Sequence, residues 1–123
     1  MKITGFQPLI VSPEAEKLIS LFEELGFEQR HEKTGINDKE ISNVSMKDAN
    51  GFRVDVTKGA TVPKNLTAIR MNVDDFSEAY ELLVKYGFKN AQGYRLTQTS
   101  SSTDTLMVSP SGFGIVLSQH IKD

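Results

Sequence analysis

Along the first half of the chain, the hydrophobic pattern changes from strand-like to helical and back to strand-like. An apolar run typical of a strand occupies residues 3–11, and residues 12–25 then place apolar side chains on one helical face. Ser12-Pro13 is typical of a helix start, and Gly26 of a helix end, because glycine adopts the left-handed backbone conformation without steric cost. The pattern after the helix predicts three more strands, at residues 27–32, 40–47 and 52–58.

The second half of the chain repeats this order of elements. A strand is predicted at residues 67–73, followed by a helix that begins at its N-cap Asp75 and ends before Gly87. Glu78 follows Asp75 at the spacing of a capping box. Three strands then complete the second β-α-β-β-β series, at residues 90–97, 105–108 and 115–121.

Two glycine landmarks recur at one spacing. Gly26 and Gly87 are 61 positions apart, as are Gly51 and Gly112, and each glycine precedes a phenylalanine. A fixed spacing of this kind indicates an internal duplication. The short connector at residues 59–65 predicts that the two halves pack as one unit.

Composition and charge then narrow the classes of function. Sixteen acidic and fourteen basic residues give a net charge of −2 with no long run of either sign, which offers no footprint for nucleic acid or an anionic membrane. The chain has no cysteine, which excludes disulfides, thiolate nucleophiles and zinc–thiolate sites. No apolar run is long enough to span a bilayer and no signal segment is visible, so we expect a cytoplasmic protein. The polar stretch at residues 98–104 is expected to be a mobile loop.

Short motifs around the predicted helices resemble those of the vicinal oxygen chelate superfamily, which includes glyoxalase I, extradiol dioxygenases and the bleomycin- and fosfomycin-resistance proteins. The motifs are Val11-Ser12-Pro13 and Val73-Asp74-Asp75 before the helices, Leu25-Gly26-Phe27 and Tyr86-Gly87-Phe88 after them, and Ser109-Pro110-Ser111-Gly112-Phe113 near the end. The resemblance implies an α+β fold over residues 1–123. Two tandem βαβββ modules, about residues 1–60 and 65–123, would form curved mixed sheets with helices on the convex face and a ligand cup on the concave face.

The metal enzymes of this superfamily carry their ligands at four strand positions. The resemblance maps these positions to Phe6, Asp55, Ala68 and Val116, of which only Asp55 can bind a metal. One carboxylate does not hold a divalent transition metal, so we expect no metal and no cofactor. His31 and His120 fall outside these positions and are expected at the surface.

Strand alternation predicts which side chains line the cup. The expected lining is Phe6, Pro8 and Ile10 from the first strand, Arg53, Asp55 and Thr57, then Ala68, Arg70 and Asn72, and finally Gly114, Val116 and Ser118. Two arginines and one acid on an apolar wall suit an organic ligand that carries a carboxylate or another planar anion. An internal ion pair of Asp55 with Arg53 or Arg70 is the structural alternative. The predicted ligand-binding residues are Phe6, Arg53, Asp55, Ala68, Arg70, Asn72 and Val116.

Three classes of function are compatible with this pattern. The leading hypothesis is a metal-free small-molecule binding protein of the bleomycin-resistance type that sequesters an organic or anionic compound. The alternative is a glyoxalase-like isomerase or lyase that uses Asp55 as its general base, with or without a metal. A third class is an interaction module whose cup is filled by Phe6, Phe52 and Phe113. The resemblance also implies a homodimer.

Overall fold

The computed structural model describes residues 1–33, 42–58, 66–91, 97–98 and 102–120. The chain forms two compact units. The N-terminal unit comprises residues 7–67, and the C-terminal unit comprises residues 68–123 together with residues 1–6. The first strand, β1 (Ile3–Val11), therefore begins in the C-terminal unit and ends in the N-terminal unit. Among the described residues, no helix is both long and apolar enough to cross a membrane.

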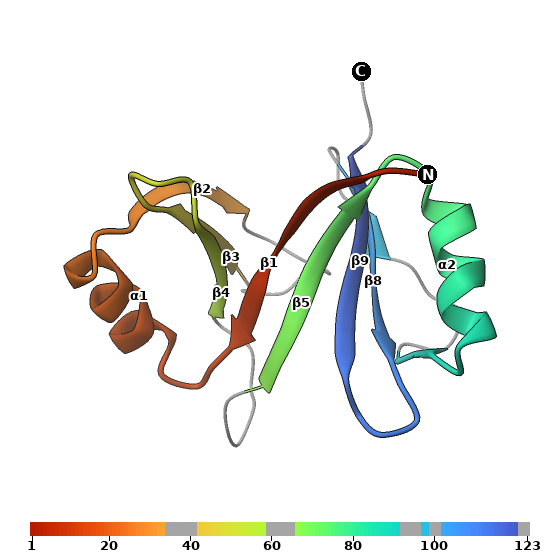
Figure 1. Ribbon diagram of the computed structural model, residues 1–123. Coiled ribbons are helices and arrows are strands. Elements are labelled where there is room, and N and C mark those ends of the chain that lie inside the picture. The colour runs from red at the N-terminus through yellow and green to blue at the C-terminus, as the bar shows by residue number, and fades with distance from the viewer. Residues whose placement is uncertain (34–41, 59–65, 92–96, 99–101, 121–123) are drawn as a thin grey trace. The chain divides into compact units, whose positions relative to one another are not determined.

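The N-terminal unit is a four-stranded mixed sheet with one helix on one face (Figure 1). Its strands lie in the order β2-β3-β4-β1, in which β1 runs parallel to β4 and the other neighbours are antiparallel. The elements after β1 are α1 (Ala15–Glu24), β2 (Glu28–Lys33), β3 (Ser42–Lys47) and β4 (Arg53–Lys58).

The C-terminal unit has the same topology (Figure 1). Here β5 runs parallel to β9, β8 is antiparallel to β9, and both β6 and β7 pair with β8. The single strand predicted at residues 90–97 is instead two short ones, and residues 92–96 lie outside the described part of the chain. The elements are β5 (Leu66–Val73), α2 (Phe76–Lys85), β6 (Lys89–Asn90), β7 (Thr97–Gln98), β8 (Ser102–Val108) and β9 (Gly114–His120).

The spacing of 61 residues relates the strand pairs of the two units as well as their glycines. Leu9 pairs with Asp55 in one unit, and Arg70 pairs with Val116, each 61 positions later, in the other. The four landmark glycines all have positive φ, between 90° and 106°. The left-handed turns that glycine permits therefore end both helices and open both final strands. The α+β fold of two βαβββ modules with curved mixed sheets is confirmed.

Each helix covers an apolar face of its sheet, and among the described elements of the unit none covers the other face. Ala15 and Ile19 of α1 pack on Val44, Met46, Val54 and Val56. In the C-terminal unit, Ala79 of α2 packs on Met71, Val73, Met107, Ile115 and Leu117. We call the side of each sheet that bears these core residues the helix face and the opposite side the open face. Alternation then assigns every intervening strand residue to the open face.

The two helices begin differently. Asp75 is the N-cap of α2 as predicted, and its side chain accepts a hydrogen bond from Glu78 N at 3.1 Å. The first helix begins at Ala15 with Glu14 as its N-cap, later than the expected start at Ser12-Pro13. Ser12 Oγ instead accepts from Glu14 N at 3.0 Å, and Ser12 N donates to Thr57 O of β4. Ser12 therefore joins the end of β1 to the turn before the helix.

Lys58 at the end of β4 links three elements of the N-terminal unit. Its Nζ lies 3.3 Å from Glu16 Oε1 of α1 and 3.4 Å from Glu32 Oε2 of β2. The hydrogen bond to Glu16 is the main reason that the pKa of the Lys58 ammonium lies above its ordinary value of 10.5. Because the folded-state pKa is raised, this stabilisation is complete below pH 10.5 and is lost as the pH rises through the higher folded-state value.

Thr105 gives a direct test of the duplicated core. It lies on the helix face of β8, 61 positions after Val44, and is 2% exposed. Among the described residues, no group hydrogen-bonds to Thr105 Oγ1. Because a buried hydroxyl without a partner is destabilising, we expect Thr105→Val to raise the free energy of unfolding by about 1 kcal/mol. Urea unfolding would measure this change.

Thr57→Val is the matched control. Thr57 Oγ1 donates to Asn43 Oδ1 at 3.2 Å, so the same substitution there should lower stability by about 1 kcal/mol. Loss of stability in both variants would contradict the assignment of Thr105 to an apolar core position.

Candidate functional site

A cluster of polar side chains surrounds Asp55 on the open face of the N-terminal unit. Asp55 is only 1% exposed. Its Oδ1 accepts hydrogen bonds from Gln7 Nε2 at 3.0 Å and from Ser45 Oγ at 2.9 Å, and its Oδ2 accepts one from Asn43 Nδ2 at 3.1 Å. Three side chains of this unit therefore stabilise the buried carboxylate.

The strand register places these donors around Asp55. Ser45 is the cross-strand partner of Asp55 in the antiparallel β3–β4 pair, and Asn43 lies two residues away on the same face. Leu9 is the partner of Asp55 in the parallel β1–β4 pair, which brings Gln7 to the same face. Thr57 Oγ1 donates to Asn43 Oδ1 at 3.2 Å, which orients the Asn43 amide with its Nδ2 toward Asp55.

The open face of the C-terminal unit carries a cation in place of an acid at its centre. Arg70 of β5 donates from NH1 to Ser118 Oγ of β9 at 3.0 Å. The same NH1 lies 3.7 Å from Asp104 Oδ1 of β8, and the Arg70 and Asp104 side chains are 17% and 15% exposed. Ala68, Leu106 and Val116 share this face and supply apolar surface around the guanidinium.

The two open faces correspond position by position at the spacing of 61 residues, with different chemistry. Asp55 corresponds to Val116, and Leu9 corresponds to Arg70. Asn43, which donates to Asp55, corresponds to Asp104, which pairs with Arg70. One module therefore centres its open face on a buried anion, and the other on a partly buried cation.

The structure brings most of the predicted residues to the open faces. Asp55 and Thr57 lie on that of the N-terminal unit, and Ala68, Arg70, Asn72, Val116 and Ser118 lie on that of the C-terminal unit. Asn72 lies against Gly5, since a Cβ added to Gly5 would be 2.7 Å from Asn72 Nδ2. Arg53 is exposed at the start of β4. The expected surface position of His120 is confirmed, whereas the side chain of His31 lies outside the described part of the structure.

The assignment of β1 needs a correction, because its alternation is opposite to the expected one. Phe6 is 62% exposed, and Ile10 packs against the core beneath α1. Gln7 and Leu9 are buried on the open face instead. Equating Val11 with Val73 in the two helix-start motifs gives a spacing of 62, which relates Ala68 to Phe6. The glycine spacing of 61 relates Ala68 to Gln7, which the structure places beside Asp55.

Sequence reasoning also missed three other members of these clusters: Asn43, Ser45 and Asp104. The hairpin at Asn50-Gly51 was the available signal for the first two. A hairpin that turns at residues 48–52 pairs Ser45 with Asp55, and Asn43 with Thr57. The turn before β9 relates Asp104 to Ser118 in the same way.

The donor set around Asp55 does not fit a divalent transition metal. Gln7 and Asn43 direct their N–H groups toward the carboxylate, and an N–H group cannot coordinate a cation. Within the described ranges, no three His, Cys, Asp or Glu side chains lie together in a group that could hold a metal ion. Asp55 is 1% exposed and accepts three hydrogen bonds from its neighbours, so its role as a general base stays a hypothesis.

Comparisons with known proteins identify the fold. No protein-family model and no curated protein matches the sequence. The structure is similar to methylmalonyl-CoA epimerase from Mycobacterium tuberculosis, with a TM-score of 0.74 and 13% identity over 98% of this chain and 90% of that one.

Two further solved structures agree. A glyoxalase/bleomycin resistance protein/dioxygenase superfamily member from Vibrio splendidus 12B01 gives a TM-score of 0.61 and 17% identity over 96% of this chain and 99% of that one. A V278E mutant of glyoxalase I from Zea mays gives a TM-score of 0.65 and 16% identity over 98% of this chain and 44% of that one. The chain has the vicinal oxygen chelate fold.

The hydrogen bonds to Asp55 predict a large effect of a small substitution. Asp55→Asn removes the charge and places an NH2 group against N–H donors, so we expect a loss of about 3 kcal/mol in the free energy of unfolding. Asp75→Asn is the matched control, because asparagine is an equally good N-cap and Asp75 is exposed. Chemical denaturation measures both variants, and equal stabilities would refute the structural role of Asp55.

Proposed function

We propose that this protein binds a small organic anion on the open face of its C-terminal unit, without a metal cofactor. Arg70 is the anchor for the anionic group. Its guanidinium is held by Ser118, is partly exposed, and belongs to a face that also presents Ala68, Leu106 and Val116. A cation beside apolar side chains suits an amphipathic ligand whose carboxylate meets the guanidinium and whose body covers the apolar surface.

Asp104 sets the electrostatic surroundings of Arg70. The distance of 3.7 Å between Arg70 NH1 and Asp104 Oδ1 is within ion-pair range but longer than a good hydrogen bond. A ligand carboxylate can approach a guanidinium at about 2.8 Å with two parallel hydrogen bonds. A ligand carboxylate would share the guanidinium with Ser118 and Asp104, and the negative charge of Asp104 would limit the affinity of the ligand.

A second candidate is an isomerase or lyase that uses Asp55 as its general base. The likeness in fold to methylmalonyl-CoA epimerase favours this reading over other catalytic ones. The three hydrogen bonds that the Asp55 carboxylate accepts favour the binding function. Incubation with methylmalonyl-CoA in D2O separates the two, because a general base would introduce deuterium at the carbon that loses a proton. Enzyme-dependent deuterium incorporation that Asp55→Asn abolishes would support catalysis.

The binding function predicts opposite effects of two neighbouring substitutions. Thermal denaturation with a panel of carboxylates, beginning with benzoate, should reveal a ligand. At a concentration of a hundred times its dissociation constant, the ligand should raise the free energy of unfolding by about 2.7 kcal/mol. Arg70→Met should abolish this stabilisation. Asp104→Asn should tighten binding about fivefold, because it removes one repulsive unit charge near the site.

Arg30→Met on β2 is the matched control, since Arg30 lies in the N-terminal unit and pairs there with Glu28. Binding that survives Arg70→Met unchanged would contradict the assignment of the anchor. Strong stabilisation by nickel, zinc or manganese in the absence of any carboxylate would contradict metal-free binding.

We also propose that the protein is a homodimer, and that it is cytoplasmic. The homodimer rests on the resemblance in sequence motifs to the vicinal oxygen chelate superfamily. Sedimentation equilibrium at micromolar concentration tests the assembly, and we expect twice the chain mass of 13.7 kDa. A species with the mass of one chain would contradict the dimer.

A further inference from the structure

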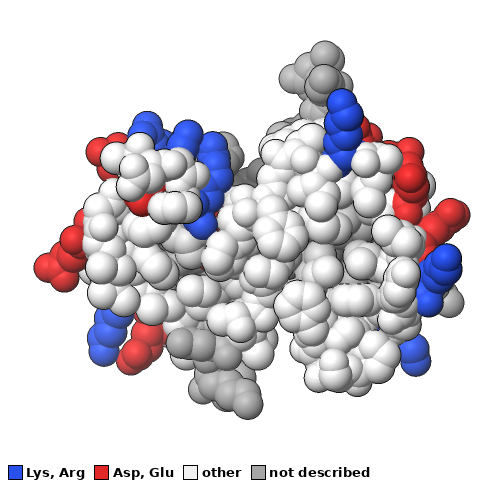
Figure 2. Space-filling model, viewed as in Figure 1, with Lys and Arg blue, Asp and Glu red and all other residues white. Residues whose placement is uncertain are grey.

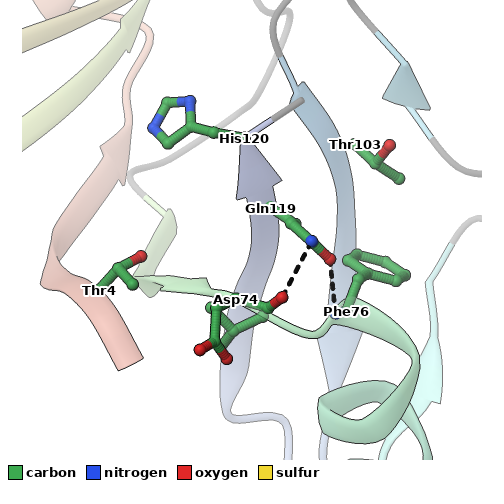
Figure 3. A pocket seen from close by; sticks show the side chains of 7 residues that line it. Thr4, Asp74, Phe76, Thr103, Gln119 and His120 are labelled. Carbon is green, nitrogen blue, oxygen red and sulfur yellow. Dashed lines mark hydrogen bonds between the residues drawn. The ribbon is translucent and has the colours of Figure 1, made fainter. Parts of the chain in front are cut away.

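A cavity of about 850 Å³ lies at the N-terminal end of α2, within the C-terminal unit (Figure 3). Its lining side chains come from the start of β1, the β5–α2 junction and the ends of β8 and β9. They include Thr4, Asp74, Phe76, Thr103, Gln119 and His120. The volume is typical of a pocket for a small organic molecule.

This cavity is separate from the open-face site around Arg70. Val73, which also lines it, belongs to the apolar core beneath α2. Thr103 and Gln119 are cross-strand partners and alternate with Asp104 and Ser118, so they lie on the helix face. The Thr103 and Gln119 wall of the cavity therefore lies on the helix face, whereas Arg70 and Ser118 lie on the open face. His120 alternates with Gln119 and lines the cavity from the end of β9.

Gln119 fixes the wall of the cavity where β5 meets α2 (Figure 3). Its Oε1 accepts from Phe76 N at 2.6 Å, and its Nε2 donates to Asp74 O at 3.0 Å. Glu78 N is bonded to the Asp75 side chain. Backbone N–H groups in the first turn of α2 are thus already satisfied by protein groups, which argues against an anion bound at the helix N-terminus.

The equivalent place in the N-terminal unit has a different chemistry. Lys58 lies 61 positions before Gln119, and its ammonium pairs with Glu16 and Glu32. Phe76 likewise corresponds to Ala15, a small residue that is packed into the core. The duplicated modules therefore differ at this end of the helix, where the C-terminal one has an aromatic ring and a neutral amide.

The side chains that line the cavity favour an aromatic ligand with a positive charge. The Phe76 ring is packed on Tyr80, with ring centroids 6.0 Å apart, and offers an aromatic surface beside the methyl groups of Val73. Thr4, Thr103 and His120 provide hydrogen-bonding groups. Among the described lining residues, Asp74 carries a negative charge. Acidic side chains also gather over this end of α2 (Figure 2).

We propose that this cavity is a second ligand site, which binds a small aromatic amine. The ring of the ligand lies against Phe76 and Val73, and its ammonium group is oriented toward Asp74. The proposal is independent of anion binding at Arg70, because Arg70, Ser118 and Asp104 are not among the lining residues of the cavity and the two sites select opposite charges.

Three probes with the same ring and different charge test this proposal: benzylamine, benzyl alcohol and benzoate. Each is titrated into the full-length, 15N-labelled protein and followed by amide chemical shifts. For benzylamine we expect chemical shift changes at Thr4, Phe76, Thr103, Gln119 and His120. Its affinity should be about fivefold above that of benzyl alcohol, because the attraction between two opposite unit charges about 4 Å apart in water-like surroundings corresponds to that factor. No shift change at these residues, or equal affinity for benzoate at this cavity, would overturn the proposal.

Two variants and a control sharpen the test. Asp74→Asn removes the charge but keeps an oxygen that can accept from Lys2 N, and it should equalise the affinities for benzylamine and benzyl alcohol. Asp75→Asn makes the same change of charge one residue away, outside the lining, and should preserve the preference for benzylamine. An equal loss of preference in both variants would contradict a direct role of Asp74.

Thr103→Leu narrows the cavity at its β8 wall and removes a hydroxyl group, and it should weaken benzylamine binding with the folded spectrum retained. Unchanged binding and unchanged shift changes in a folded Thr103→Leu protein would show that the amine binds elsewhere. If Thr103→Leu does not fold, the smaller change Thr103→Val tests the same wall, and we expect weaker binding because a hydroxyl partner is lost.

Discussion

The parallel pairing of the first and last strand of each module is the constraint on which the rest of this structure depends. Parallel neighbours cannot be joined by a tight turn, so the chain between them must cross over. Here the crossover contains a helix and antiparallel strands, β2 and β3 in one module and β6, β7 and β8 in the other. The helix covers one sheet face with apolar side chains, and the opposite face then receives the residues that alternate with the core.

This pairing decides which side chains meet on the open face, but not what chemistry they have. The register that joins Leu9 to Asp55 also joins Arg70 to Val116, so each module places one charged and one apolar residue at the same crossing. The charge is on the last strand in one module and on the first strand in the other. A charge in this position requires partners, because desolvation without compensation is costly. Asp55 has three neutral donors from two strands, β1 and β3, whereas Arg70 has a hydroxyl and a carboxylate.

Most of the fold could be predicted from the sequence because its signals are local. Asp75 and the four landmark glycines fix element ends through their own backbone requirements, and the spacing of 61 residues shows the duplication. The sequence does not show as clearly which residues of β1 lie on the open face. A strand has a period of two, so one residue of misalignment exchanges its faces, and the choice of Val73 as the equivalent of Val11 exchanged Gln7 for Phe6.

The partners of Asp55 depend on information from distant parts of the sequence. Gln7 reaches Asp55 across a parallel strand pair from 48 positions away in sequence, and nothing in the local pattern of β1 marks that pairing. Ser45 and Asn43 are closer, and the hairpin at Asn50-Gly51 sets their register. The later start of α1 has a similar cause, because Ser12 is bound by Thr57 of β4 rather than by the helix that follows it.

The duplication also explains how one small chain can present two environments of opposite charge preference. Identical registers keep both cores apolar, with Met46 and Met107 at equivalent and fully buried positions. Substitutions outside those positions do not disturb the core, so the modules could diverge there. In the C-terminal module this produced a guanidinium on the open face and an acidic end of α2 on the helix face, separated by the sheet. The guanidinium and the Asp74 carboxylate belong to two sites that have none of the described residues in common, so each site can select its own ligand charge.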